Sequence, residues 1–159
     1  MEKDLFKKIC GSFTTGVTVI TSNDKMTDYG FTASSFTSVS IDPFLILFCL
    51  NKEAKSNIAL KKKNFFIVNI LNEKQINICN QFANNKLKPE QTFKGVDTIN
   101  SNNQIKKISN SIAFLECQVT EKIEAGDHYI YVGKVLEGEL NENLLKPLIY
   151  QNGLIKNLL

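Results

Sequence analysis

Residues 30–40 read GFTASSFTSVS, and the architecture of the chain depends on what this stretch becomes. Small and hydroxylated side chains are set between aromatic residues, which is too polar for a core strand and too β-branched for an ordinary loop. The stretch follows the alternating segment VTVITS (17–22) and the turn-forming residues SNDK (22–25), so it is predicted to be the returning strand of a β-hairpin. Its small side chains would let the backbone approach a flat ligand. The alternative is an exposed, polar edge strand.

The hydrophobic pattern in the rest of the sequence indicates a mainly β protein. Further strands are predicted at residues 44–50, 65–71, 112–124, 129–140 and 146–153. Short helices are expected at residues 2–12, 54–62 and 72–83, whereas the polar residues 84–110 are expected to form a long surface loop. Six or seven strands in hairpin order suit a closed antiparallel barrel, because closure removes exposed strand edges. We expect one domain over residues 1–159, without repeats or linkers.

Composition excludes several classes of protein. The chain has 159 residues, is 43% hydrophobic and 22% charged, and carries a net charge of +3, which is too small for a nucleic-acid-binding surface. The four cysteines stand alone, without metal-ligand spacing, and no signal peptide or membrane-length apolar run is present. These features predict a reduced, soluble, cytoplasmic protein that binds neither nucleic acid nor membrane.

The motifs of several enzyme classes are also missing from the sequence. There is no G-x-G-x-x-G after a strand, no Walker phosphate loop, no H-E-x-x-H and no G-x-S-x-G. A single histidine, His128, excludes a multi-histidine metal site, and we expect no metal.

Apart from residues 30–40, two other short segments could contribute to a binding or catalytic site. In CLNKEAKSNI (49–58), Lys55 and the helix-start residue Ser56 make a suitable anion site, such as one for a phosphate; the alternative is a simple helix cap. In AGDH (125–128), His128 at a hairpin turn could meet a substrate near neutral pH; the alternative is a solvated turn residue.

Several separated motifs together resemble the short-chain flavin reductases, the reductase components of two-component flavin-dependent monooxygenases. FTTGVTVITS, GFTASSFTSVSIDPFLILFCL, KSN, FFIVNIL, NQFA, AGDHYIYVGKV and PLIY occur in order over residues 5–155. The resemblance implies an FMN-binding split β-barrel of antiparallel, Greek-key type, usually a homodimer with flavin sites near the interface. It also implies hydride transfer from NADH or NADPH to FMN or FAD, with reduced flavin passing to a partner oxygenase.

Carried over motif by motif, the resemblance also implies site residues. The flavin ring and ribityl chain would lie against Thr32, Ala33, Ser34, Ser35, Phe36, Thr37 and Ser38. Further cofactor contacts would come from Cys49, Leu50, Asn51, Lys55, Ser56, Asn57, Phe82 and Ala83, with Lys55, Ser56 and Asn57 on the phosphate. His128 would face the nicotinamide. A flavin performs hydride chemistry itself, which agrees with the lack of an acid–base pair in the sequence.

The sequence departs from the family at two places. Gly153 is followed by Leu154 and Ile155, where the family usually has an aromatic residue, and residues 84–110 lack the usual Gly/Pro-rich pattern. The missing aromatic leaves an alternative function open, that of a non-enzymatic FMN-binding electron carrier on the same barrel.

Overall fold

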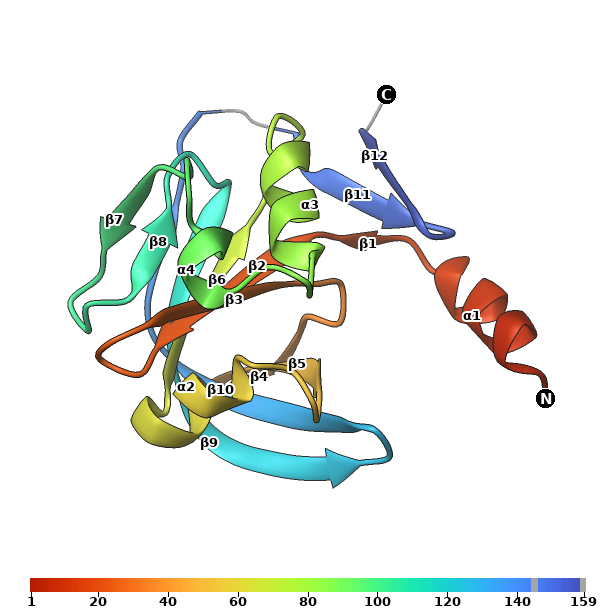
Figure 1. Ribbon diagram of the computed structural model, residues 1–159, viewed down its shortest axis with the longest axis horizontal. Helices are drawn as coiled ribbons and strands as arrows, with labels where there is room; N and C mark the ends of the chain where they lie inside the picture. The colour runs from red at the N-terminus through yellow and green to blue at the C-terminus, as the bar shows by residue number, and fades with distance from the viewer. Residues whose placement is uncertain (144–145, 158–159) are drawn as a thin grey trace.

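A seven-stranded sheet forms the body of the protein (Figure 1). The computed structural model describes residues 1–143 and 146–157. The strands follow the order β3-β2-β6-β9-β10-β5-β4, and every pair of neighbours is antiparallel. Their bounds are β2 (Thr18–Asn23), β3 (Asp28–Ala33), β4 (Thr37–Ile41), β5 (Phe44–Asn51), β6 (Phe65–Ile70), β9 (Ala113–Ala125) and β10 (His128–Leu140). The prediction of a mainly β, antiparallel fold is confirmed.

Residues 30–40 do not form one strand, as the sequence predicted, but two strands at opposite edges of the sheet. The chain leaves β3 at Ala33, crosses through residues 34–36 and enters β4 at Thr37. β3 and β4 are not paired with each other in the described residues. The sheet is nevertheless curled, because Phe31 of β3 packs its ring 5.7 Å from that of Phe48 in β5. Small and hydroxylated residues continue through this break, and no Gly or Pro marks it in residues 31–40.

Residues 84–110, expected to be a long loop, contain three short elements instead. These are α4 (Pro89–Thr92), β7 (Thr98–Asn100) and β8 (Lys106–Ile108), with β7 and β8 paired as a two-stranded sheet. Ile105 and Ile108 from this segment are buried. Elements of three or four residues are too short to produce a detectable hydrophobic period, which explains the wrong prediction.

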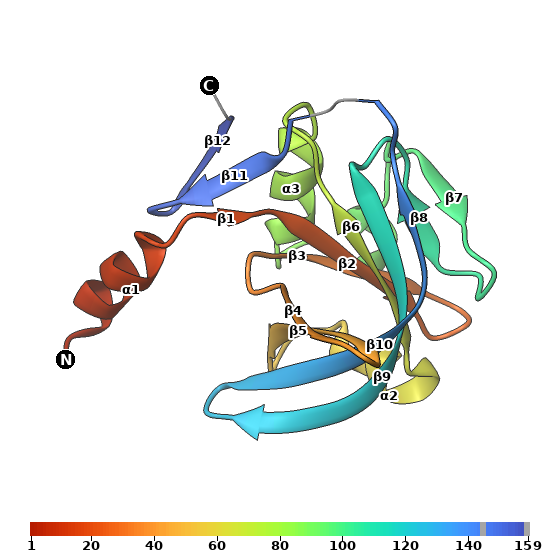
Figure 2. The same cartoon turned by 180° about the vertical axis from the view of Figure 1, so that it is seen from behind.

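A third sheet has the order β1-β11-β12 and lies at the end of the molecule where α1 projects (Figures 1 and 2). It consists of β1 (Thr15–Gly16), β11 (Leu148–Gln151) and β12 (Leu154–Asn157). β12 is an additional strand, since only one had been expected in the tail.

Three further helices are α1 (Lys3–Gly11), α2 (Asn57–Lys63) and α3 (Ile76–Ala83), close to their predicted positions. α1 has no buried residue, whereas α3 buries Cys79 and Phe82. Within residues 1–143 and 146–157, no helix has the length and apolar character needed to cross a membrane.

The hydrophobic core consists of two clusters that meet at β2. Neighbouring residues of this strand point to opposite faces, so Val19 enters the cluster beneath α3 while Ile20 enters the cluster between the halves of the curled sheet. In the latter, Phe48 stacks on Tyr131 at 5.3 Å and meets the edge of Phe66 at 5.0 Å. This aromatic cluster supports β5 and β10, whose ends border the cavity described below.

Gly133 in β10 tests how tightly this core is packed. A Cβ at this position would lie 2.4 Å from the ring of Phe66, which is fully buried and cannot move aside freely. We expect Gly133→Ala to lower the free energy of unfolding by about 1–3 kcal/mol in urea denaturation. Gly16→Ala is the matched control, because a Cβ there meets nothing within 4 Å. Equal stability of the two variants would contradict the described packing.

Candidate functional site

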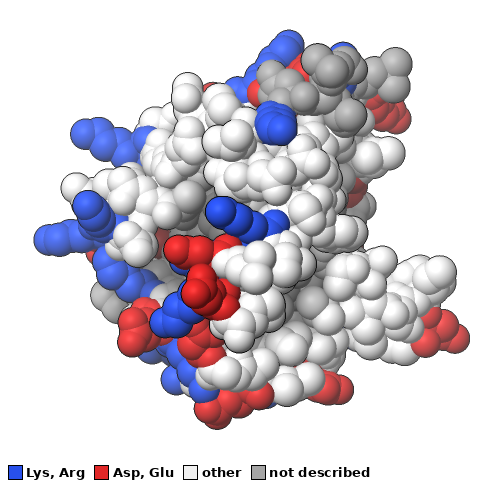
Figure 3. Space-filling view, turned by 90° about the vertical axis from the view of Figure 1, so that its right-hand side faces the viewer, with Lys and Arg blue, Asp and Glu red and all other residues white. Residues whose placement is uncertain are grey.

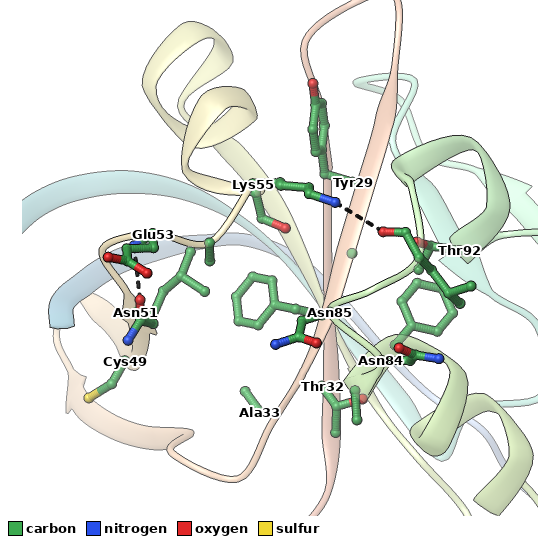
Figure 4. A pocket seen from close by; sticks show the side chains of 18 of the residues that line it. Tyr29, Thr32, Ala33, Cys49, Asn51, Glu53, Lys55, Asn84, Asn85 and Thr92 are labelled. Carbon is green, nitrogen blue, oxygen red and sulfur yellow. Dashed lines mark hydrogen bonds between the residues drawn. The ribbon is translucent and has the colours of Figure 1, made fainter. Parts of the chain in front are cut away.

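A cavity of about 710 Å³ opens between β3, the loop after β5 and the segment from α3 to α4 (Figure 4). Its lining residues come from four separate stretches of the chain and include Tyr29 to Ser35, Cys49 to Asn51, Glu53 to Ser56, Phe82 to Asn85, Leu87, Pro89, Thr92 and His128. Twelve of these match the site residues expected from the sequence: Thr32, Ala33, Ser34, Ser35, Cys49, Leu50, Asn51, Lys55, Ser56, Phe82, Ala83 and His128.

β3 and the crossing after it form a wall of small side chains. The Thr32 hydroxyl donates to the carbonyl of Cys79 in α3 at 2.7 Å, and Ser35 Oγ accepts the N–H of Cys49 in β5 at 2.9 Å. These two hydroxyls therefore hold the wall in place. Ser34 has an exposed side chain with no hydrogen-bond partner among the described residues, so its hydroxyl is available to a ligand.

Gly30 lets an aromatic ring pack directly on the backbone of β3, on the side of α3. A Cβ at Gly30 would lie 2.4 Å from the ring of Phe82, which packs directly on the strand. Phe82 in turn meets the edge of Phe93 at 5.0 Å. The cavity thus has an aromatic side that only glycine at position 30 permits.

The loop between β5 and α2 supplies the polar end of the cavity. The Lys55 ammonium group extends across the cavity and donates to the carbonyl of Leu87 at 3.2 Å (Figure 4). Ser56 was predicted to cap α2, but its side chain makes no capping hydrogen bond. Its hydroxyl has no partner within the described part of the chain and borders the cavity. The loop therefore brings a lysine and an unused hydroxyl from consecutive residues to the cavity.

Four expected site residues do not line the cavity. Phe36 packs against the core, and Thr37 and Ser38 belong to β4. Asn57 is buried behind the loop, where its side chain bonds to the loop itself.

His128 is the first residue of β10 and pairs with Asn51 of β5. Its ring is partly exposed at the rim of the cavity, and Nδ1 lies 2.7 Å from a carboxylate oxygen of Asp127. The hydrogen bond from His128 and its charge lower the pKa of the Asp127 carboxyl. The paired carboxylate fixes the ring so that its other nitrogen is free to meet a ligand.

The sequence reasoning missed ten lining residues: Tyr29, Gly30, Phe31, Glu53, Ala54, Asn84, Asn85, Leu87, Pro89 and Thr92. Five of them belong to the segment that was expected to be a loop. Leu87 and Pro89, two apolar residues within the polar residues 84–92, are the signal that could have indicated this part of the cavity.

The chemistry of the lining suits a flat ring with an anionic tail. The small side chains from Thr32 to Ser35 and the ring of Phe82 can cover a planar group, and Lys55 with Ser56 can bind an anion. No group of three or more His, Cys, Asp or Glu residues that could hold a metal ion occurs within residues 1–143 and 146–157.

Comparison with known proteins agrees with this chemistry. The family described as "Flavin reductase like domain" matches residues 10–159. The reductase subunit HsaB of a flavin-dependent monooxygenase from Rhodococcus jostii is 32% identical over 93% of this chain and 74% of its own length. A probable flavin reductase from Rhizobium meliloti is 41% identical over 79% of this chain, which spans only 40% of that protein.

Among solved structures, the NADH:FAD oxidoreductase SgcE6 of Streptomyces globisporus, in complex with NAD and FAD fragments, superposes with a TM-score of 0.92. It is 29% identical, and the match covers 99% of this chain and 93% of that protein. The family match extends over nearly the whole chain and includes every stretch that lines the cavity, so this protein belongs to the flavin reductase family.

Proposed function

We propose that the protein is an NAD(P)H:flavin oxidoreductase, which transfers a hydride from NADH or NADPH to FMN or FAD. The observation that carries the proposal is the cavity itself: a wall of small residues at one side and the residues Lys55 and Ser56 on a neighbouring loop, in a chain of the flavin reductase family. Reduced flavin would pass to a partner oxygenase, as the names of its relatives indicate for those proteins.

A bound flavin supplies the hydride-accepting ring, and the protein supplies binding and orientation. We assign the ring to the wall from Thr32 to Ser35, with Cys49, Leu50 and Asn51 along one side and Phe82 and Ala83 along the other. In this arrangement Ser34 donates a hydrogen bond to the ring or ribityl chain. Phe36, Thr37 and Ser38 act indirectly, by anchoring the end of the crossing.

Lys55 and Ser56 would bind the flavin phosphate. Lys55 already spans the cavity to the carbonyl of Leu87, so its ammonium has the reach to turn toward an anion inside. A phosphate is a stronger partner for an ammonium than a neutral carbonyl is. α2 has only seven residues, so these two side chains, rather than a helix dipole, are the basis of this assignment.

We assign His128 to the nicotinamide. Its ring lies at the rim of the cavity, where a second substrate reaches a flavin that is already bound. Asp127 orients the ring through Nδ1 and leaves Nε2 for the substrate.

The same assignment extends to assembly and architecture. We propose a homodimer that covers exposed apolar side chains, among them Leu5, Phe6 and Ile9 of α1 and Ile41 and Phe44 at the turn between β4 and β5. Figure 3 shows a broad uncharged surface on the side where α1 projects. We also propose that residues 1–159 form one domain, a split barrel of Greek-key type, because β2 contributes to both core clusters. The four free cysteines support a reducing, cytoplasmic location.

Anaerobic turnover tests the proposed function. Purified protein is mixed with FMN or FAD and with NADH or NADPH, and flavin bleaching is followed together with nicotinamide oxidation. We expect stoichiometric loss of both absorbances for at least one pair. Tight FMN binding without turnover for any pair would contradict the reductase and support the electron carrier.

The phosphate assignment predicts a selective effect of Ser56→Ala. We expect the Kd for FMN to rise about tenfold, or about 1.4 kcal/mol, because a hydrogen bond to a charged group is lost. The Kd for riboflavin, which has no phosphate, should change less than about twofold. Ser34→Ala is the control, and it should raise the Kd for FMN and the Kd for riboflavin by the same factor. Unchanged discrimination between the flavins in Ser56→Ala would refute the assignment.

The role of His128 predicts a different selectivity. His128→Ala should raise the KM for the nicotinamide nucleotide or slow hydride transfer about tenfold in stopped-flow experiments. FMN affinity should stay within about twofold of the wild type. Equal losses in flavin affinity and in hydride transfer would show that His128 only maintains the end of β10.

A further inference from the structure

One buried amide holds the loop of residues 51–56 from behind. The Nδ2 group of Asn57 donates to the loop carbonyls of Asn51 at 2.9 Å, Lys52 at 3.1 Å and Ala54 at 3.0 Å. Asn57 is only 6% exposed, so these bonds are shielded from water. A single side chain therefore binds three carbonyls of the loop.

The orientation of this amide is fixed by its neighbours. If the amide were flipped, Oδ1 of Asn57 would face three carbonyl oxygens, which repel it. Oδ1 must therefore point the other way, toward Tyr131, whose hydroxyl lies 2.7 Å away. Because Oδ1 is an acceptor, the Tyr131 hydroxyl is the donor. The phenol thus completes the hydrogen bonds of the amide.

The Tyr131 hydroxyl lies at the edge of an otherwise apolar cluster. The residue is 1% exposed, and its ring stacks on Phe48. Burial, with a smaller effect from Tyr129, raises the pKa of Tyr131 to about 12, so the hydroxyl keeps its proton at neutral pH. The ring packing itself requires no hydroxyl, and a phenylalanine would occupy the same space. Within the described residues, the bond to Asn57 is the one hydrogen bond that this hydroxyl donates.

The same strand also supports the beginning of the loop. The Lys52 N–H donates to the carbonyl of Asp127 at 3.0 Å, at the turn before β10, and Asn51 pairs with His128. β10 thus contacts the loop at its start through the backbone and at its end through Tyr131 and Asn57.

We propose that Tyr131 and Asn57 are positioning residues for the flavin phosphate: through their hydrogen bond they hold the loop so that Lys55 and Ser56 face the cavity. This inference rests on the proposed function of Lys55 and Ser56. Neither Tyr131 nor Asn57 lines the cavity, so both act only through the loop. Asn57, expected from the sequence to contact the phosphate, is assigned instead to the support behind it.

The test is Tyr131→Phe, which keeps the ring and removes the hydroxyl. Leaving Oδ1 of Asn57 without its donor should loosen the loop and raise the Kd for FMN about tenfold, while the Kd for riboflavin changes less than about twofold. The KM for the nicotinamide nucleotide should not change. Tyr129→Phe is the matched control on the same strand, because the Tyr129 hydroxyl has no hydrogen-bond partner among the described residues, and it should leave the FMN-to-riboflavin ratio intact.

A double variant tests whether the two residues act together. Asn57→Ala should lose the same preference for FMN over riboflavin. Adding Tyr131→Phe to this variant should cause no further loss of that preference. Additive losses would overturn the proposal, as would equal weakening of FMN and riboflavin in Tyr131→Phe, which indicates a general loss of stability. If the wild type and Tyr131→Phe both bind FMN more tightly than riboflavin by the same factor, the positioning role is wrong but the phosphate assignment stands. If the wild type itself does not discriminate, the phosphate assignment fails and the positioning role fails with it.

Discussion

The hydrogen bonds between Ser35 and the backbone of Cys49 fix the crossing on which the rest of the site depends. Residues 34–36 carry the chain from one edge of the curled sheet to the other, and Ser35 Oγ binds the N–H of Cys49 at 2.9 Å and lies 3.3 Å from its carbonyl. This places the small residues after β3 against the end of β5. The loop that follows β5 then faces the same space, and α3 closes it through Thr32 and Phe82. The cavity is therefore formed by the curled sheet, the loop after β5 and α3 together.

The physical demands of hydride transfer explain why so few of these residues are chemically reactive. Because a flavin accepts the hydride on its own ring, the protein needs a shaped wall, an anion-binding end and an entrance for the second substrate. The cavity is lined by small, hydroxylated and aromatic side chains and a lysine, which suit these tasks. The residues that hold this arrangement, such as Asn57 and Tyr131, lie behind the lining and are buried. Tyr131 also belongs to the aromatic cluster beneath β5 and β10, so the support of the loop is continuous with the core.

Sequence patterns predicted the elements that are long and regular. The strands β5 and β6 are short, nearly continuous apolar runs, β9 and β10 flank a clear turn sequence, and α1 and α3 have the apolar spacing of a helix. The motifs around Ser34, Lys55 and His128 lie at the cavity. The predictions that were wrong concern short segments of the chain. No Gly or Pro marks the break between β3 and β4 in residues 31–40, and α4, β7 and β8 are too short for a period. The Asn57 side chain was assigned to a ligand because sequence gives residue type and spacing but not the direction in which a side chain points.

A crystal structure of the protein with FMN bound would test the central claim most directly. The account predicts that the flavin ring lies against the backbone from Thr32 to Ser35, with its phosphate within hydrogen-bond distance of Ser56 Oγ and Lys55 Nζ. Lys55 will then have left the carbonyl of Leu87. A flavin bound elsewhere, or bound in this cavity with its phosphate pointing away from Lys55 and Ser56, would contradict the account.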